Sequence, residues 1–138
     1  CQRRAVAMAR MPMQIETMER IVSGETLKGD VLTPARVAGV LGAKRTSDII
    51  PMCHHVPLDM VELSATFDYD TPALELRVTV KATGRAGVEI EAMTAVMAAA
   101  LTVFELVKHY DRTVFIEQIR VLEKRGGDHE FTLDEKSE

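Results

Sequence analysis

A chain of 138 residues that is 46% hydrophobic and 28% charged has the size and composition of one folded domain, which excludes an intrinsically disordered protein. Its net charge of −4 argues against a general nucleic-acid surface, so any phosphate would have to be bound by a local group of cations. Two cysteines, no apolar run of the roughly 18 residues that span a bilayer, and no visible signal peptide favour a reduced, cytoplasmic protein without a membrane partner. From the length we expect residues 1–138 to be a single domain. Because the sequence starts at Cys1 rather than at a methionine, we expect this domain to lack some N-terminal residues.

The first third of the chain is predicted to form a strand followed by two helices. Apolar side chains alternate over residues 5–15, which predicts a strand that Pro12 ends or places at a sheet edge. The apolar spacing then lengthens to that of a helix, which Gly24 can cap. Thr33 and Pro34 suit the N-cap and the first position of a second helix. The expected buried stripe of that helix consists of Val37, Val40 and Leu41.

The remainder is predicted to form a hairpin, a long helix and a last strand. Residues 56–82 alternate in two runs around a Thr-Pro turn, which is typical of a β-hairpin. After Gly87, apolar residues recur at spacings of three and four, which predicts a helix. Its expected inward positions are Ile90, Met93, Met97, Ala100, Phe104 and Val107. A strand with room for a bulge follows over residues 114–122.

This order of elements is the βαββαβ pattern of ferredoxin-like α+β folds, in which helices cover one face of an antiparallel sheet. We expect the opposite face to need cover as well, and this favours an oligomer.

Cations, an imidazole and paired carboxylates stand beside glycines or a proline at several places in the chain. Lysines and arginines can bind phosphates, whereas a histidine and carboxylates can move protons. These residue types together indicate a pocket for a phosphorylated, polar small molecule. The segments concerned are Lys28-Gly29-Asp30, Ala43-Lys44-Arg45-Thr46, Ile50-Pro51-Met52-Cys53-His54 and Gly87-Val88-Glu89-Ile90-Glu91.

The paired acidic residues of the long helix allow two interpretations. Glu89 and Glu91 would share one face if residues 87–91 were extended and the helix began near Glu91. Otherwise they are ordinary acidic residues in the first turn of a helix, where the helix dipole favours them.

Glu105 and Lys108 lie one helical turn apart and can form a surface ion pair or serve a site. On a straight helix they would lie about 21–26 Å from Glu91. A small substrate could therefore contact Glu91 and this pair together only if two subunits shared a pocket. Cys53, His54 and His55 have no recognised zinc spacing, and we expect no metal site.

Several motifs, in order and spacing, resemble the cyclic pyranopterin monophosphate synthase family, which is the molybdenum cofactor biosynthesis protein C family. The resemblance extends from about Arg3 to Gly127. The segments that carry it are Lys28-Gly29-Asp30, Ala35-Arg36-Val37-Ala38-Gly39, Ala43-Lys44-Arg45-Thr46, Ile50-Pro51-Met52-Cys53-His54, Thr83-Gly84-Arg85-Ala86-Gly87-Val88-Glu89-Ile90-Glu91-Ala92-Met93-Thr94 and Ala99-Ala100-Leu101-Thr102-Val103.

The resemblance implies an enzyme that converts 3′,8-cyclo-7,8-dihydroguanosine 5′-triphosphate to cyclic pyranopterin monophosphate and releases diphosphate. It also implies a homo-hexamer built as a trimer of dimers, with active sites between subunits, and no organic cofactor.

The resemblance further implies the roles of individual residues. Lys28 and Lys108 match the family's catalytic lysines, and Glu105 stands where the family has a catalytic aspartate. The positions that match substrate contacts are Met52, Cys53, His54, Ile90 and Glu91. Further pocket positions are Glu89, Arg36 and Lys44.

Three departures from the family pattern keep a second interpretation open. Glu105 replaces an aspartate, His55 replaces the usual proline, and the C-terminal glycine-rich loop is shortened to residues 124–128. The alternative is a divergent paralogue, or a nucleotide-sensing βαββαβ module that binds its ligand without turning it over.

Overall fold

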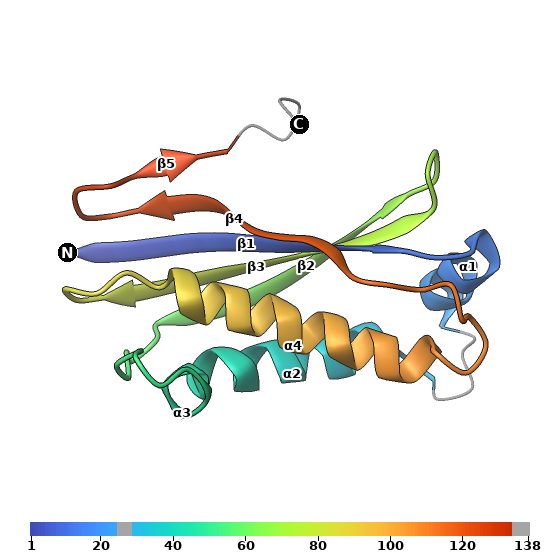
Figure 1. Cartoon of the computed structure of the whole chain (residues 1–138), viewed down its shortest axis with the longest axis horizontal. Helices are drawn as coiled ribbons and strands as arrows, with labels where there is room; N and C mark the ends of the chain where they lie inside the picture. Colours follow the sequence, from blue (N-terminus) through green and yellow to red (C-terminus); the bar gives the residue numbers. More distant parts are fainter. Residues whose placement is uncertain (25–28, 134–138) are drawn as a thin grey trace.

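The computed structural model describes residues 1–24 and 29–133. Figure 1 shows one sheet with helices packed along one of its faces. The elements are β1 (Gln2–Pro12), α1 (Ile15–Ser23), α2 (Leu32–Lys44), α3 (Thr46–Ile49), β2 (Met60–Asp68), β3 (Ala73–Thr83), α4 (Glu89–Val107), β4 (Glu117–Arg125) and β5 (Phe131–Thr132).

The sheet confirms the predicted fold class. Its strands follow the order β2-β3-β1-β4-β5, and every neighbouring pair is antiparallel. With α2 after β1 and α4 after β3, the first four strands make the predicted βαββαβ unit. Two elements were not predicted, the short α3 and the edge strand β5. The helix α1 was predicted, and it lies beyond the end of β1 (Figure 1).

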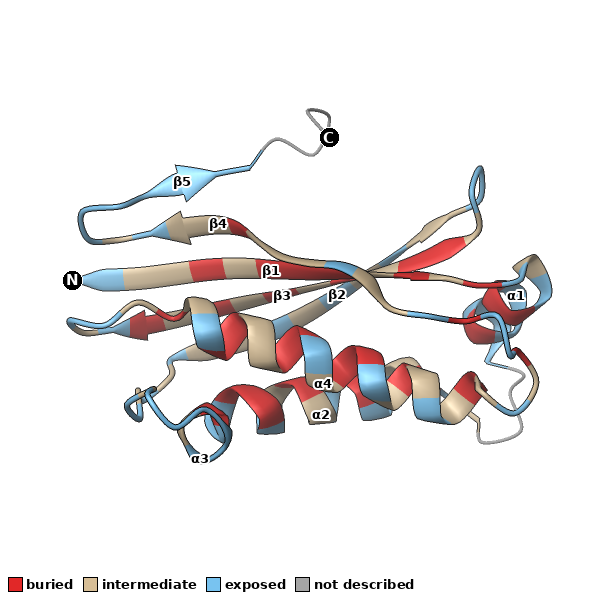
Figure 2. Cartoon of the chain, in the orientation of Figure 1, coloured by how far each residue is buried: buried red, intermediate tan, exposed pale blue. Residues whose placement is uncertain are grey.

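The inward face of the sheet carries the predicted alternation. β1 buries its small residues and Met11 on this face, while β3 beside it buries larger aliphatic side chains (Figure 2). On this face of β1 and β3, the residues with no exposed surface are Ala5, Ala7, Ala9, Met11, Leu74, Leu76, Val78, Val80 and Ala82. Because β1 supplies mostly alanines, α4 can pack close to the centre of the sheet.

The faces that the helices bury differ in part from the prediction. In α2, Val37 and Leu41 are 56% and 48% exposed, and α2 buries Ala35, Gly39, Gly42 and Ala43 instead. In α4, Ile90 and Met97 are exposed, whereas Ala100 and Val107 are buried as predicted, and most of the other buried positions are alanine or valine. The two helices pack antiparallel, with small residues such as Gly42 and Ala98 at their contact (Figure 1).

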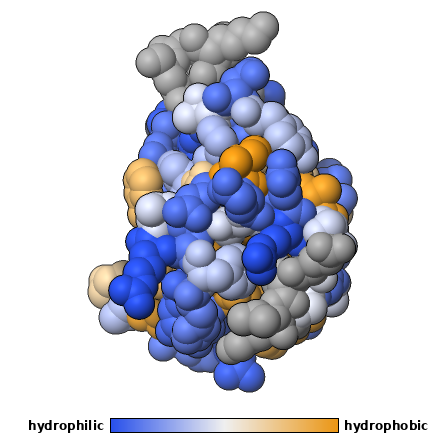
Figure 3. All heavy atoms as spheres, turned by 90° about the vertical axis from the view of Figure 1, so that its right-hand side faces the viewer, coloured by the Kyte–Doolittle hydropathy of each residue, from blue (hydrophilic) through white to orange (hydrophobic). Residues whose placement is uncertain are grey.

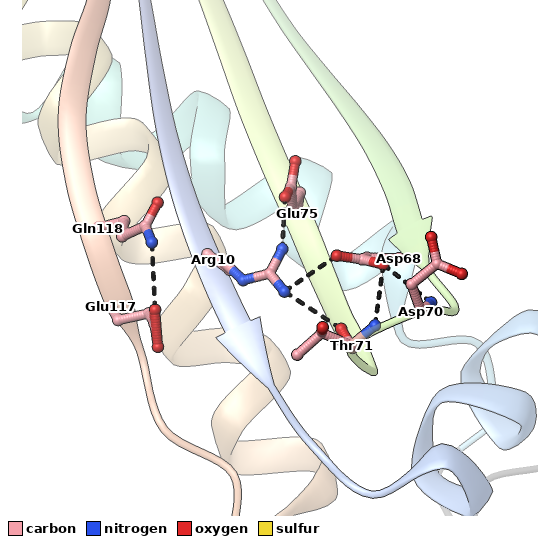
Figure 4. A network of polar contacts seen from close by, with 7 residues as sticks. All are labelled: Arg10, Asp68, Asp70, Thr71, Glu75, Glu117 and Gln118. Carbon is pink, nitrogen blue, oxygen red and sulfur yellow. Dashed lines mark hydrogen bonds and ion pairs between the residues drawn. The ribbon is translucent and has the colours of Figure 1, made fainter. Parts of the chain in front are cut away.

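The outer face of the sheet is polar in the described residues, which contradicts our reason for expecting it to be covered. Side chains on this face include Arg10 of β1, whose guanidinium donates to Glu75 at 2.6 Å and to Asp68 at 3.0 Å (Figure 4). Asp68 also accepts the backbone N–H groups of Asp70 and Thr71, so this network ties β1 to the β2–β3 turn. Exposed apolar side chains lie on the helices, in several loops and at the β5 edge instead.

α4 also corrects the expectation that no segment could span a membrane. Among the described residues it is the one helix that is long and apolar enough to do so by length and composition. Here one side of α4 packs against α2 and the sheet, as the core helix of a folded domain does.

Local details position the helix ends. Gly24 adopts a φ of 75° as the C-cap of α1, as predicted. The α2 helix begins one residue before Thr33, and the cap is supplied by Asp30, which accepts the N–H of Leu32 at 3.0 Å and the Thr33 hydroxyl. The predicted bulge is present in β4, where the pairing register with β1 shifts near Gln118, whose φ is 52°.

Candidate functional site

One groove brings together the loop after α3 and the first turn of α4. It encloses about 390 Å³ at the end of the molecule where α4 begins. Its lining residues are Ile50, Met52, Cys53, His54, Val56, Ala86, Gly87, Glu89, Ile90 and Glu91. All six positions predicted on the Met52-Cys53-His54 and Glu89-Ile90-Glu91 segments therefore lie around one space, although 34 residues separate His54 from Glu89 in the chain.

Glu91 is the buried acid of this groove. It is 3% exposed, and the Cys53 thiol donates to its Oε2 atom at 3.6 Å. Burial, followed by the charge of Glu91 and this hydrogen bond, raises the pKa of the Cys53 thiol above its ordinary value. The groove therefore holds a neutral thiol against a buried carboxylate, beside the exposed His54 and Met52.

Glu89 has a different partner, because α4 begins at Glu89 rather than near Glu91. The structure therefore supports the second interpretation, in which both glutamates lie in the first turn of a helix. On a helix, positions two apart point in directions about 200° apart, so the two carboxylates have different partners. Its carboxylate pairs with Lys124 of β4, with 2.9 Å between Nζ and Oε2.

Sequence reasoning assigned no role to Lys124 or to Arg3, which both stabilise this end of the molecule. The Arg3 guanidinium donates to the carbonyl oxygens of Gly84 and Arg85, and it thereby holds the loop between β3 and α4. The turn after β4 packs on the same residue: Gly126 and Gly127 have φ values of 93° and 80°, and a Cβ atom at Gly127 would collide with the Arg3 side chain. The sequence motifs around Gly84 and Gly126 were visible, but only the fold brings them to Arg3.

Glu105 and Lys108 lie at the opposite end of α4. Their side chains form an ion pair with 2.7 Å between Nζ and Oε2, and both are substantially exposed. A second groove of about 350 Å³ lies here, and it is lined by Phe104, Lys108, His109, Asp111, Arg112 and Val114. Figure 3 views the molecule from this end and shows a largely hydrophilic surface with small apolar areas.

The remaining predicted cations lie on or near α2. Lys44 is the last residue of α2 and is exposed, at the end of the helix that leads into α3 and the Cys53 loop (Figure 1). Arg36 is exposed in the first part of the helix, where its charge helps to lower the pKa of Asp30, mainly set by the hydrogen bond from Thr33. Lys28 lies outside the described residues.

The structure therefore separates the predicted site residues into two groups. Seventeen positions of α4 separate Glu91 from Lys108, which corresponds to about 26 Å along the helix. One chain alone cannot bring both groups to one small molecule. Within the described residues there is no group of three or more histidine, cysteine, aspartate or glutamate side chains placed to hold a metal ion.

Comparison with known protein families matches residues 1–127 to the MoaC family. The chain is 49% identical over 125 residues to the cyclic pyranopterin monophosphate synthase of Chloroflexus aurantiacus, covering 91% of this chain and 77% of that protein. Proteins of the same name from Natranaerobius thermophilus and Clostridium acetobutylicum are 46% and 42% identical over 125 residues, with 91% of this chain covered and 79% and 78% of those proteins. This chain belongs to the MoaC family.

Proposed function

We propose that this protein is a cyclic pyranopterin monophosphate synthase of molybdenum cofactor biosynthesis. It converts 3′,8-cyclo-7,8-dihydroguanosine 5′-triphosphate to cyclic pyranopterin monophosphate and releases diphosphate. The observation that carries this proposal is the identity of 42–49% with proteins of that name across 91% of the chain. The gathering of six sequence-predicted residues around one groove supports it.

The groove at the start of α4 binds the purine-derived part of the substrate. The buried Glu91 carboxylate offers hydrogen-bond acceptors, and a neutral thiol and an imidazole lie opposite it. A base rich in N–H donors suits these acceptors, because burying a carboxylate that has too few hydrogen-bond donors costs free energy. Met52 is 91% exposed at the rim, where its flexible side chain can cover a bound ring.

The other end of α4 carries the catalytic groups. Lys108, together with Lys28, supplies positive charge for the triphosphate and for the leaving diphosphate. Glu105, which is held within 2.7 Å of the Lys108 ammonium, is the carboxylate that moves protons as the ring is rebuilt. Closing the cyclic phosphate forms a bond from a substrate hydroxyl to the α-phosphorus and breaks the bond to the diphosphate oxygen, so a group must accept that hydroxyl proton.

A complete site combines the two ends from two subunits. We propose a homo-hexamer, a trimer of dimers, in which the groove of one chain faces Lys108 of its partner. The separation of about 26 Å between the two groups within one chain supports this arrangement. The exposed apolar side chains on the helices, including Val37, Leu41 and Leu101, provide surface for such contacts. The reduced cytoplasm is the compartment that we propose, and two unpaired cysteines fit it.

The test is pterin formation by the purified protein from the cyclised triphosphate, with diphosphate measured in parallel. We expect equal amounts of pterin product and diphosphate from the wild type and neither from Lys28→Ala, with unchanged thermal unfolding. Binding of the triphosphate without either product would overturn the synthase and favour the nucleotide-sensing alternative.

A further inference from the structure

Asp111 is a buried carboxylate that the proposed chemistry does not use. It lies just after the end of α4 and is 1% exposed. Its Oδ2 atom accepts the backbone N–H of Gln14 at 2.9 Å and the Thr17 hydroxyl at 2.7 Å. Its Oδ1 atom accepts the backbone N–H and the hydroxyl of Thr113, at 2.8 and 2.6 Å. One side chain thus joins two segments that are about a hundred residues apart in the sequence.

The ionised form of Asp111 is the one that suits these four donors. Burial opposes ionisation, but the hydrogen bonds from Thr113, Gln14 and Thr17 outweigh it and hold the pKa of Asp111 below its ordinary value. A carboxylate accepts at both oxygens, whereas an amide would present an N–H₂ group to one pair of donors. The site is therefore sensitive to the replacement of one oxygen.

Backbone hydrogen bonds connect the segment that contains Asp111 to Lys108 and to the end of α4. The backbone N–H groups of Tyr110 and Asp111 both donate to the carbonyl of Val107, at 3.2 and 3.1 Å, and Lys108 donates to Phe104 at 2.9 Å. These bonds make residues 107–111 a tight turn that contains Lys108. A second contact joins the same two segments, because the Arg20 guanidinium of α1 lies 5.3 Å from the centre of the Tyr110 ring.

We propose that Asp111 is a positioning residue: it fastens α1 to the end of α4 and thereby fixes the backbone from which Lys108 projects into the active site. This inference rests on the proposed function for its catalytic consequence. The same contacts hold α1, which ends five residues before Lys28 in the sequence.

The test compares Asp111→Asn with a matched Asp68→Asn variant. Asp68 also accepts two backbone N–H groups in a turn, but within the described residues it makes no hydrogen bond to Asp111 or Lys108, and it lies outside the proposed machinery. Thr17→Val removes only the side-chain bond to α1, while Thr17→Ser keeps the hydroxyl. Amide hydrogen exchange and steady-state kinetics are measured on all four variants, in the full-length protein and below the unfolding transition.

We expect Asp111→Asn to increase exchange together in residues 14–23 and 104–113, while residues 89–95 at the start of α4 stay protected. We expect kcat to fall about 10- to 100-fold, since a misplacement of about 1 Å can cost that much. KM should change less than about threefold, because the substrate groove lies at the other end of the helix. Thr17→Val should show a weaker form of the same effect, which Thr17→Ser restores, and Asp68→Asn should leave kcat unchanged.

Two results would overturn the positioning role: unchanged exchange in both segments of Asp111→Asn, or an equal fall of kcat in Asp68→Asn, which would mean that general loss of stability is the cause. A wild type without synthase activity would refute the proposed function, and with it the catalytic part of this inference. The exchange measurement would in that case still decide whether Asp111 fastens α1 to α4.

Discussion

The two glutamates at the start of α4 show how a single residue's neighbours decide its chemistry. Glu91 is buried against the Cys53 thiol, whereas Glu89 reaches Lys124 on the neighbouring strand β4. A neutral thiol next to a buried carboxylate is a donor, and it keeps the carboxylate partly satisfied until a ligand arrives. Glu89 instead holds the first turn of α4 to the sheet.

The reactivity of Cys53 tests this arrangement. Burial and the Glu91 charge favour the neutral thiol, so we expect Cys53 to be alkylated more slowly than the exposed Cys1 at pH 8. Glu91→Gln removes the charge, so the pKa of Cys53 should fall and its alkylation rate should rise by a factor of about 3 to 10. The rates are measured by mass spectrometry of the peptides.

The matched control for this prediction is Glu89→Gln, which removes a charge two residues away and should leave the Cys53 rate unchanged. The pH dependence has a definite sign. A thiol whose pKa is raised on folding contributes stability that is complete below the ordinary value of 9.0 and is lost as the pH rises through the raised pKa. Equal alkylation rates in wild type and Glu91→Gln would show that Glu91 does not control this thiol.

Glu105 is one of the three departures from the family pattern that the sequence resemblance predicts, with a glutamate where an aspartate is expected. We expect Glu105→Gln to lose about 10²-fold or more in single-turnover pterin formation, because it keeps the size of the side chain and removes the proton-carrying carboxylate. Glu105→Asp should keep activity or gain it. The melting temperatures of both variants should stay close to that of the wild type, since exposed ion pairs such as Glu105–Lys108 contribute less than about 1 kcal/mol.

A fully active Glu105→Gln variant would contradict this role and leave Glu105 as a surface partner of Lys108. The helical spacing in the sequence indicated that Glu105 and Lys108 could pair, and the family resemblance supplied their proposed catalytic roles. It could not identify Arg3 or Lys124, because their partners lie 81 and 35 residues away and meet them only through the sheet. Contacts of this kind depend on the pairing register of the strands, which cannot be read from a single sequence.

At the scale of elements, the packing of α2 on α4 depends on small side chains. A Cβ atom at Gly42 would lie 2.9 Å from the Ala98 Cβ and 3.1 Å from the Thr94 carbonyl oxygen. At Gly39 the nearest atom would be 3.6 Å away, which is ordinary contact. The two glycines therefore have different requirements, although both are buried in the same helix.

We expect Gly42→Ala to destabilise the protein by about 1–3 kcal/mol, because the backbones of α2 and α4 would have to move apart. Gly39→Ala should instead stabilise it by about 0.5–1 kcal/mol through the higher helix propensity of alanine. Urea unfolding of both variants measures the difference. Equal effects in the two variants would show that the interhelical distance at Gly42 is not limiting.

The same small residues explain why the sequence predicted the existence of both helices but not their buried faces. Hydrophobic periodicity gives most weight to large side chains such as Val37, Leu41 and Met97, and it placed them in the core. The buried face of α2 consists of glycine and alanine, whose signal is weak, and that of α4 of alanine and valine, while Val37, Leu41 and Met97 are exposed. The strands were easier to predict, because alternation in β1 and β3 leaves no doubt about which side faces the helices.

At the scale of the whole molecule, the order of elements in the sequence predicted the sheet topology. It did not predict which surface is available for contact with another subunit. The outer face of the sheet, which we expected to need cover, carries charged networks such as Arg10 with Asp68 and Glu75 (Figure 4). The exposed apolar residues of α2 and α4 offer a different surface for a second subunit. The stronger reason for an oligomer is functional, because the two groups of site residues lie at opposite ends of α4.

A mixture of two inactive variants tests whether two subunits share each site. Glu91→Gln impairs the substrate groove, and Lys108→Ala removes a proposed catalytic group about 26 Å away on the same helix. If each site takes its groove from one chain and Lys108 from another, some sites in mixed oligomers contain neither substitution. Random mixing of equal amounts should place about one site in four in this intact class, so activity should return to about a quarter of the wild-type value.

The two variants are produced together with different tags, and mixed oligomers are isolated by sequential purification, with each variant alone as the control. Restored activity would also require the active species to be larger than a 15.3 kDa monomer in light scattering. Mixed oligomers as inactive as the single variants would contradict the shared site, because each chain would then need both of its own ends.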